Sequence, residues 1–88
     1  MTKLVNGKQI RSARGLLGWS QSKLAQESGL SINSVAKFER EEVNTTTGTL
    51  ITLTTTLENA GIEFWNYKDG RFGVMFIPSQ TDQDKNED

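Results

Sequence analysis

The chain has 88 residues, of which 10 are Lys or Arg and 11 are Asp or Glu, and it contains neither His nor Cys. This length is enough for one small domain. The missing Cys and His exclude disulfides, thiol nucleophiles and the commonest metal ligands and general bases. No apolar run approaches the roughly 18 residues of a membrane span, and the N-terminus lacks the apolar stretch of a secretory signal. We therefore expect a cytoplasmic protein with no metal, cofactor or catalytic residues.

The charge is segregated along the chain. Residues 1–40 carry seven basic and two acidic side chains, a net charge of +5, whereas residues 79–88 (SQTDQDKNED) carry a net charge of −3. A basic first half suggests a polyanionic partner such as nucleic acid, although ordinary surface charge is the alternative interpretation. The last ten residues have the composition of a disordered acidic tail.

One repeated pattern predicts three short helices. An apolar residue precedes an Asn or Ser cap, and a second apolar residue follows five positions after the first. The pattern occurs at Val5-Asn6 with Ile10, Trp19-Ser20 with Leu24, and Leu30-Ser31 with Val35. Gln9 would complete a capping box with Asn6. The predicted helices span residues 7–17, 21–28 and 32–40, with Gly18 and Gly29 ending the first two.

A fourth helix is predicted from the threonine cluster at 45–47 to Ala60, before Gly61. Its apolar side chains at Leu50, Leu53, Leu57 and Ala60 lie on one helical face. The β-branched residues between 51 and 56 weaken this interpretation locally. Helix is still preferred, because the 3.6-residue period is kept.

Residues 62–67 and 72–77 predict a β-hairpin around Asp69-Gly70. A two-residue turn would place Tyr67 opposite Phe72, Trp65 opposite Val74 and Phe64 opposite Met75. One face would then show Ile62, Phe64, Met75 and Ile77, and the other Trp65, Tyr67, Phe72, Val74 and Phe76. The second face is the candidate dimer interface, because both faces are apolar and only one can pack on the helices. The alternative is that helix packing and the tail cover both.

The segment from Gln21 to Phe38 contains two predicted helices joined by a short turn centred on Gly29. A turn of this length makes the helices cross steeply. The spacing of Gln21, Ala25, Gly29, Val35 and Phe38 resembles the helix-turn-helix of the phage repressor and Cro-like family, of the xenobiotic-response-element (XRE) type. The resemblance covers roughly residues 7–60. It implies a four-helix lambda-repressor-like domain over residues 1–61. With the hairpin over 62–78, which replaces the family's commoner fifth helix, and the tail over 79–88, the predicted fold class is mainly α.

The resemblance also implies roles for individual residues in binding double-stranded DNA. Residues 32–40 would form the recognition helix, with Ile32, Asn33 and Lys37 on base edges. Arg14 and Glu39 would form an internal ion pair. The implied phosphate contacts are Ser20, Gln21, Lys23, Ser31, Ser34 and Arg40. The alternative for Asn33 and Lys37 is plain solvated surface.

Glu41 and Glu42 depart from the family pattern, because two carboxylates beside a DNA backbone would be repelled. Either this loop points away from DNA or binding is weak. The leading hypothesis is a homodimeric regulator, expected to act as a repressor, on a palindromic operator. The alternatives are a DNA-binding antitoxin with a toxin as protein partner, or a protein–protein adaptor that has lost DNA binding.

Overall fold

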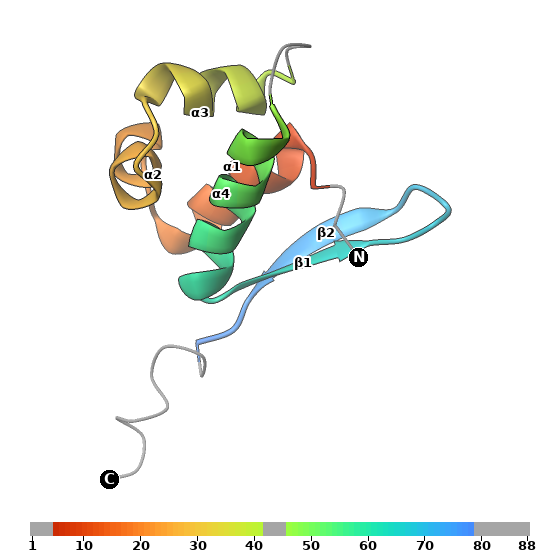
Figure 1. The fold of residues 1–88 in the computed structure, drawn as a ribbon. Coiled ribbons are helices and arrows are strands. Elements are labelled where there is room, and N and C mark those ends of the chain that lie inside the picture. The colour runs from red at the N-terminus through yellow and green to blue at the C-terminus, as the bar shows by residue number, and fades with distance from the viewer. Residues whose placement is uncertain (1–4, 42–45, 79–88) are drawn as a thin grey trace, which may run out of the picture.

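A computed structural model describes residues 5–41 and 46–78 of the chain. Four helices, α1 (Gly7–Leu17), α2 (Gln21–Ser28), α3 (Ile32–Glu39) and α4 (Thr47–Asn59), precede the strands β1 (Ile62–Asn66) and β2 (Phe72–Phe76) (Figure 1). This order confirms the predicted fold class, four helices followed by a hairpin. The predicted acidic tail lies outside the described residues.

The predicted caps begin the first three helices. Asn6, Ser20 and Ser31 each accept a hydrogen bond from the backbone N–H three residues later. The capping box is complete, because the Asn6 N–H donates to Gln9 Oε1 over 3.0 Å. The third helix ends at Glu39, one residue earlier than predicted, and Arg40 is its C-cap. Short-range side-chain bonds therefore fix where these helices start.

The core lies between the four helices and the inner face of the hairpin. It contains one or more fully buried apolar side chains from every helix; its members are Val5, Ile10, Ala13, Leu24, Ala25, Val35, Phe38, Leu53, Leu57, Ile62 and Phe64. In α4 the predicted period holds, with Leu53 and Leu57 fully buried. The Thr56 hydroxyl donates to the Thr52 carbonyl over 2.8 Å, so this threonine satisfies its polar group within the helix.

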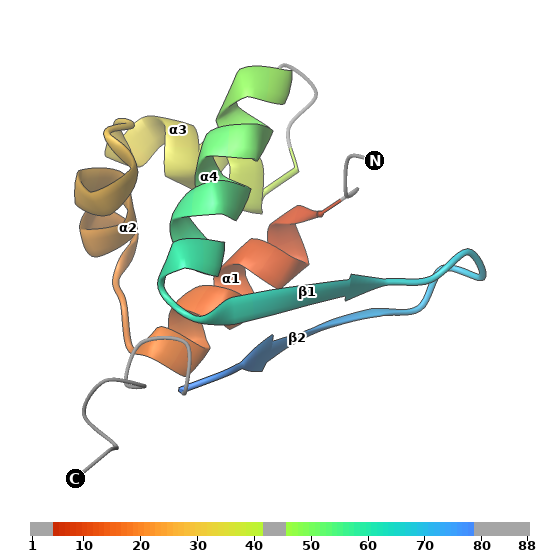
Figure 2. The same cartoon turned by 60° about the horizontal axis from the view of Figure 1, so that its bottom comes forward.

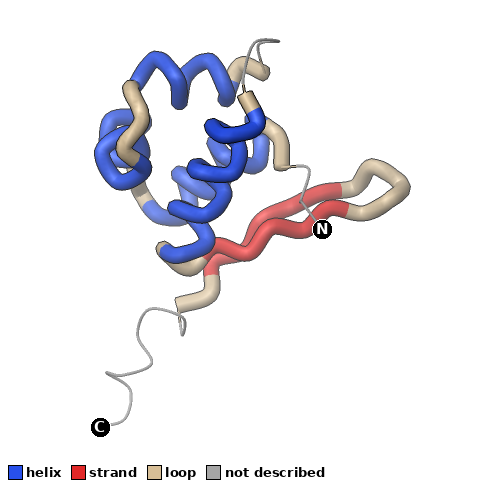
Figure 3. Tube along the Cα trace, in the orientation of Figure 1, coloured by secondary structure: helices blue, strands red, loops and turns tan. Residues whose placement is uncertain are grey.

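The hairpin and α3 occupy opposite sides of the molecule. In Figure 1, α3 forms the upper edge and the hairpin the lower edge, with α1 and α4 between them. The turned view in Figure 2 keeps this separation, and Figure 3 shows both strands along the base of the helical part. β1 contacts α4 and β2 contacts α1. A molecule bound to the outer side of the hairpin would therefore leave α3 accessible.

The predicted hairpin register is wrong by one residue. Phe64 pairs with Val74 and Trp65 with Gly73, around a three-residue loop closed by a hydrogen bond from the Tyr67 N–H to the Arg71 carbonyl. A two-residue type I′ turn needs positive φ at both central residues, but only Gly70 (φ 95°) has it in this loop. The Asp69 carboxylate instead accepts from the Arg71 N–H over 3.1 Å, which favours the longer loop.

The change of register corrects the predicted division of the hairpin faces. Val74 and Phe76 lie on the same face as Ile62 and Phe64 and pack against the core, on the side opposite the predicted one. Met75 lies on the opposite face and is 47% exposed. This follows from the two-residue period of a strand, in which a shift by one residue moves every side chain to the other face.

The dimer candidates Trp65 and Tyr67 point outward, as the prediction required. Phe72 shares the inner side by register, yet it lies near the loop, beyond the helices, and is 45% exposed. The outer hairpin face is therefore made of Glu63, Trp65, Tyr67, Arg71, Gly73 and Met75.

A buried amide on α1 bonds to the hairpin. Gln9 is 1% exposed, and its Nε2 donates to the carbonyls of Trp65 (3.2 Å) and Gly73 (3.0 Å). Its Oε1 accepts from Asn66 Nδ2 over 3.1 Å. Gly73 has no side chain, and the Trp65 side chain lies on the opposite face of the sheet. The Gln9 amide can therefore lie directly against the strand backbone.

Within residues 5–41 and 46–78, no helix is long and apolar enough to cross a membrane. Nor does this part of the chain bring together three or more carboxylates that could bind a metal ion.

Candidate nucleic-acid interface

The turn between α2 and α3 gives α3 its direction. Gly29 adopts a left-handed conformation (φ 76°), and its N–H and that of Leu30 both donate to the Ala25 carbonyl. Ala25 is 5% exposed and lies where the two helices meet, so a larger side chain would separate them. Val35 anchors α3 to the core and has no exposed surface.

This packing leaves one edge of α3 in solvent. Asn33 and Lys37 are exposed, and Ile32 is 50% exposed. An amide, an ammonium and a branched apolar group on one helical edge can respectively bind adenine, guanine and a thymine methyl group. One face of α3 therefore packs on the core through Val35, and the other presents Ile32, Asn33 and Lys37 to solvent.

An ion pair joins α1 to the end of α3. Arg14 Nε and Nη2 donate to the two Glu39 carboxylate oxygens over 2.6 Å and 3.0 Å, and Nη1 donates to the Trp19 carbonyl. The Glu39 side chain is only 4% exposed. Burial alone would raise the pKa of Glu39, but hydrogen bonds from Arg14 and Gln21, with the charges of Arg14 and Arg11, hold it below its ordinary value. The hydrogen bond to Glu39 in turn raises the pKa of Arg14.

Gln21 connects the beginning of α2 to the same carboxylate. Its Nε2 donates to Glu39 Oε1 over 3.0 Å. An amide nitrogen carries two protons, so this bond leaves the second available to another acceptor. The ion pair and Gln21 therefore hold α1, α2 and α3 in one polar network.

The sequence matches the helix-turn-helix family HTH_3 over residues 10–60. The chain belongs to this helix-turn-helix family. No curated protein matches the chain significantly. Among solved structures, a chain of the "HipA-HipB-O2-O3 complex" is 27% identical, with a TM-score of 0.55 over 66% of this chain and 87% of that one. A chain of the "HipB-O4 20mer complex" has the same identity and coverage, with a TM-score of 0.56.

The DNA-binding domain of the P22 C2 repressor is similar as well. It is 28% identical, with a TM-score of 0.54 over 66% of this chain and 76% of that chain. These findings confirm the resemblance to XRE-type phage repressors. The HTH_3 protein described here is a DNA-binding transcriptional regulator with double-stranded DNA as its partner.

The other predicted phosphate ligands lie at the ends of α2 and α3. Lys23 has two partners within the protein. Its Nζ forms an ion pair with Glu27 Oε2 over 3.0 Å and lies 5.8 Å from the centre of the Trp19 ring. Ser20 caps α2 and keeps its hydroxyl proton available to an acceptor. The Ser31 hydroxyl donates to Ser34 Oγ over 3.1 Å. Arg40 is exposed at the C-terminal end of α3, which places it at the opposite end of that helix from Ser31 and Ser34.

Sequence reasoning missed the contact between the first turn of α1 and the end of α3. A Cβ built on Gly7 would lie 2.5 Å from the Phe38 carbonyl oxygen and 2.6 Å from that of Glu39. The Gly7 N–H donates to Glu41 Oε2 over 3.1 Å. A glycine at the start of an otherwise regular helix, directly after a good cap, was the available signal of a close backbone approach.

Glu41, one of the two acidic residues that follow α3, bonds to another part of the protein. Its carboxylate is bound at the N-terminus of α1, where the helix dipole favours negative charge. It adopts the left-handed conformation (φ 60°) that is uncommon for a residue other than glycine. Glu42 lies outside the described residues.

Proposed function

We propose that the protein regulates transcription by inserting α3 into the major groove of a specific DNA sequence. The observation that carries the proposal is the exposed edge of Ile32, Asn33 and Lys37 on a helix whose other side is fixed in the core. Base edges in the major groove present distinct patterns of donors, acceptors and methyl groups, which these three side chains match. Membership of a DNA-binding family points to a regulator rather than an enzyme.

Phosphate contacts at the start of α2 would set the register of α3 on the duplex. We assign Gln21 the central role, because one amide proton is held by Glu39 and the second is available to a phosphate oxygen. The N-terminus of α2 adds backbone N–H groups and a favourable dipole. Ser20, Lys23, Ser31, Ser34 and Arg40 would supply further contacts without sequence information.

Two copies would bind the inverted half-sites of a palindromic operator, with centres about 34 Å apart. Such an assembly would repress by covering a promoter, and it would act in the cytoplasm, where bacterial DNA lies. In this arrangement residues 1–61 read the DNA. The hairpin over 62–78 lies away from the duplex and is available for other contacts.

A second function is favoured by the likeness to the chain in a complex that contains both HipA and HipB. By analogy, this protein would act as an antitoxin that binds DNA and a toxin together. The separation between α3 and the hairpin is compatible with two simultaneous partners. A toxin-like reading frame next to the gene would favour this function over simple repression.

Selection of binding sites from random duplex DNA tests the proposal. We expect one enriched sequence with two inverted halves. Asn33→Ala should cost about 1–3 kcal/mol and relax the preference at one base pair in each half. Gln21→Ala should weaken binding to all sequences alike, at a temperature where circular dichroism shows the variant folded. Asn59→Ala, an exposed change at the end of α4, is the matched control and should alter neither quantity.

Two outcomes would contradict these assignments. Evenly reduced affinity for every sequence in Asn33→Ala would remove that residue from base recognition. Binding to random duplex that is undetectable even at low salt would remove DNA binding itself, because phosphate contacts alone give measurable, salt-dependent affinity.

A further inference from the structure

We propose that the outer hairpin face is the surface through which two copies of the protein pair back to back. The proposal goes beyond the proposed function, because insertion of α3 into DNA does not require it. It rests on three features of this face: an apolar centre, opposite charges at its two ends, and its position relative to α3.

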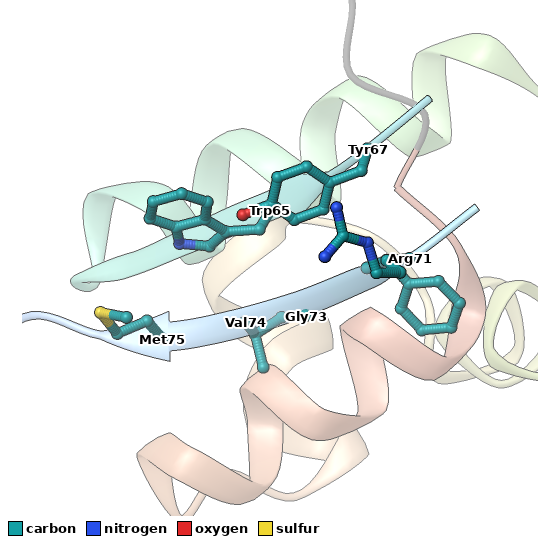
Figure 4. Close-up of a pocket in the computed structure, with 7 residues that line it drawn as sticks. Trp65, Tyr67, Arg71, Gly73, Val74 and Met75 are labelled. Carbon is teal, nitrogen blue, oxygen red and sulfur yellow. The ribbon is translucent and has the colours of Figure 1, made fainter. Parts of the chain in front are cut away.

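The centre of the outer hairpin face is aromatic and exposed. Trp65 and Tyr67 stack with ring centres 6.2 Å apart and planes inclined by 28°, and they remain 40% and 46% exposed. Beside them, residues of both strands line a shallow pocket of about 330 Å³ that extends to Met75 (Figure 4). The face therefore offers both protruding rings and a depression that could receive a ring from a second copy.

The two ends of this face carry opposite charges. Glu63 lies at the base of the hairpin. Lys68 and Arg71 lie at the loop end, which keeps a net positive charge although Arg71 pairs with Asp69 over 2.9 Å. The Arg71 guanidinium lies 4.6 Å from the centre of the Tyr67 ring. In a two-fold pair the same surface meets itself. With the two hairpins antiparallel, Glu63 of each copy lies over Arg71 of the other, and the aromatic centres meet. Such a face is complementary to itself in shape and in charge.

The size of the patch indicates weak association. A full aromatic side chain has about 150–250 Å² of surface, so the exposed parts of Trp65 and Tyr67, with that of Met75 beside them, amount to roughly 250 Å². Standard interfaces bury about 800 Å² on each partner. The acidic residues 79–88 are a poor alternative occupant, because they include no large apolar side chain.

Pairing through this face has a consequence for DNA. Because α3 lies on the opposite side of the molecule, a back-to-back pair directs its two recognition helices away from each other. Such a pair would hold two separate duplex segments. It is distinct from the side-by-side arrangement of two copies on one operator.

Charge exchange tests the pairing directly. In sedimentation runs over a concentration series, wild type should pass from monomer to dimer. Glu63→Arg and Arg71→Glu should each shift the midpoint at least tenfold upward, because each homodimer then contains two like-charge pairs. An equimolar mixture of the two variants should associate as well as wild type, since both charge pairs are restored. A mixture that associates no better than its components, or a wild type that stays monomeric, would overturn the proposal and leave a different partner protein as the occupant.

Two further variants separate pairing from folding and from DNA binding. Trp65→Thr should abolish association, whereas Ile51→Thr, which changes an exposed apolar residue on α4, should not. Wild type should link an immobilised duplex to a second, fluorescent duplex, and Trp65→Thr should bind each duplex singly without linking them. Linking that survives in Trp65→Thr would contradict the proposal, while loss of all binding by wild type would instead refute the proposed function.

Discussion

Both α3 and the hairpin are attached to the first helix, but by contacts of different physical kinds. The end of α3 is held by the Arg14–Glu39 ion pair and by direct backbone contact at Gly7. The hairpin is held by apolar side chains and by the neutral amide of Gln9. The attachment of α3 therefore depends on ionisation and on the close backbone approach at Gly7, whereas the hairpin is attached through neutral contacts.

The first turn of α1 takes part in both attachments. Gly7 faces the end of α3, and Gln9, two residues on, faces the strands. The side of the molecule that carries α3 and the outer hairpin face are thus connected through one helical turn. Substitutions in this turn should separate the two attachments experimentally.

The largest effect is expected from Gly7→Ala. The added Cβ would meet two backbone carbonyl oxygens at 2.5 and 2.6 Å, and neither can move without displacing α3. We expect a loss of about 3 kcal/mol or more in the free energy of unfolding, measured by urea denaturation. DNA binding should weaken in the fraction that remains folded.

Gly15→Ala in the same helix is the matched control. A Cβ on Gly15 has no neighbour within 4 Å, so the substitution should raise stability by about 0.5–1 kcal/mol through the better helix propensity of alanine. Equal stability changes in the two variants would show that the close approach of α1 and α3 has no energetic importance.

These two glycines also mark what could be predicted from the sequence. The caps at Asn6, Ser20 and Ser31 act within four residues, so their positions were visible in the sequence and the helix starts followed. The close contact at Gly7 is with residues more than thirty positions away along the chain. The sequence around Gly7 does not show which residues these are. Local rules therefore gave the helices but not the contacts that orient them.

The register of the hairpin, too, could not be predicted from local rules. Asp69-Gly70 correctly predicted a turn, but a two-residue loop would need positive φ at Asp69, and only Gly70 has it. That one choice reversed the faces of Val74 and Met75. In α3, the buried positions Val35 and Phe38 predict that Ile32, Asn33 and Lys37 face solvent, and the structure has all three exposed.

A smaller effect, specific to the attachment of α3, is expected from Glu39→Gln. The variant keeps the shape of the side chain but leaves Arg14 without a charged partner, which should cost about 2–3 kcal/mol at pH 7 after allowance for the partial exposure of Arg14. Because folding lowers the pKa of Glu39, its stabilising contribution is complete above the unfolded value of about 4.3 and is lost as the pH falls through the lower folded value.

Urea denaturation between pH 7 and pH 2.5 checks this prediction. The difference in stability between wild type and Glu39→Gln should be constant near neutrality and shrink below about pH 4.3. Asp69→Asn is the matched control, because its ion pair with Arg71 is exposed and should contribute less than about 1 kcal/mol. A pH-independent difference for Glu39→Gln would place its effect in packing rather than charge.

The smallest effect is expected from Gln9→Ala. The change removes the amide bonds to Trp65, Gly73 and Asn66 and the capping-box bond from the Asn6 N–H, so we expect a loss of about 1–2 kcal/mol that does not vary between pH 5 and 8. Amide hydrogen exchange should accelerate in β1 and β2 and much less in α3, since the ion pair and the Gly7 contact remain. Gln26→Ala, an exposed change in α2, should leave exchange unaltered. Equal acceleration in α3 would mean that the two attachments open together and that the first turn of α1 transmits disturbance from the hairpin to the recognition helix.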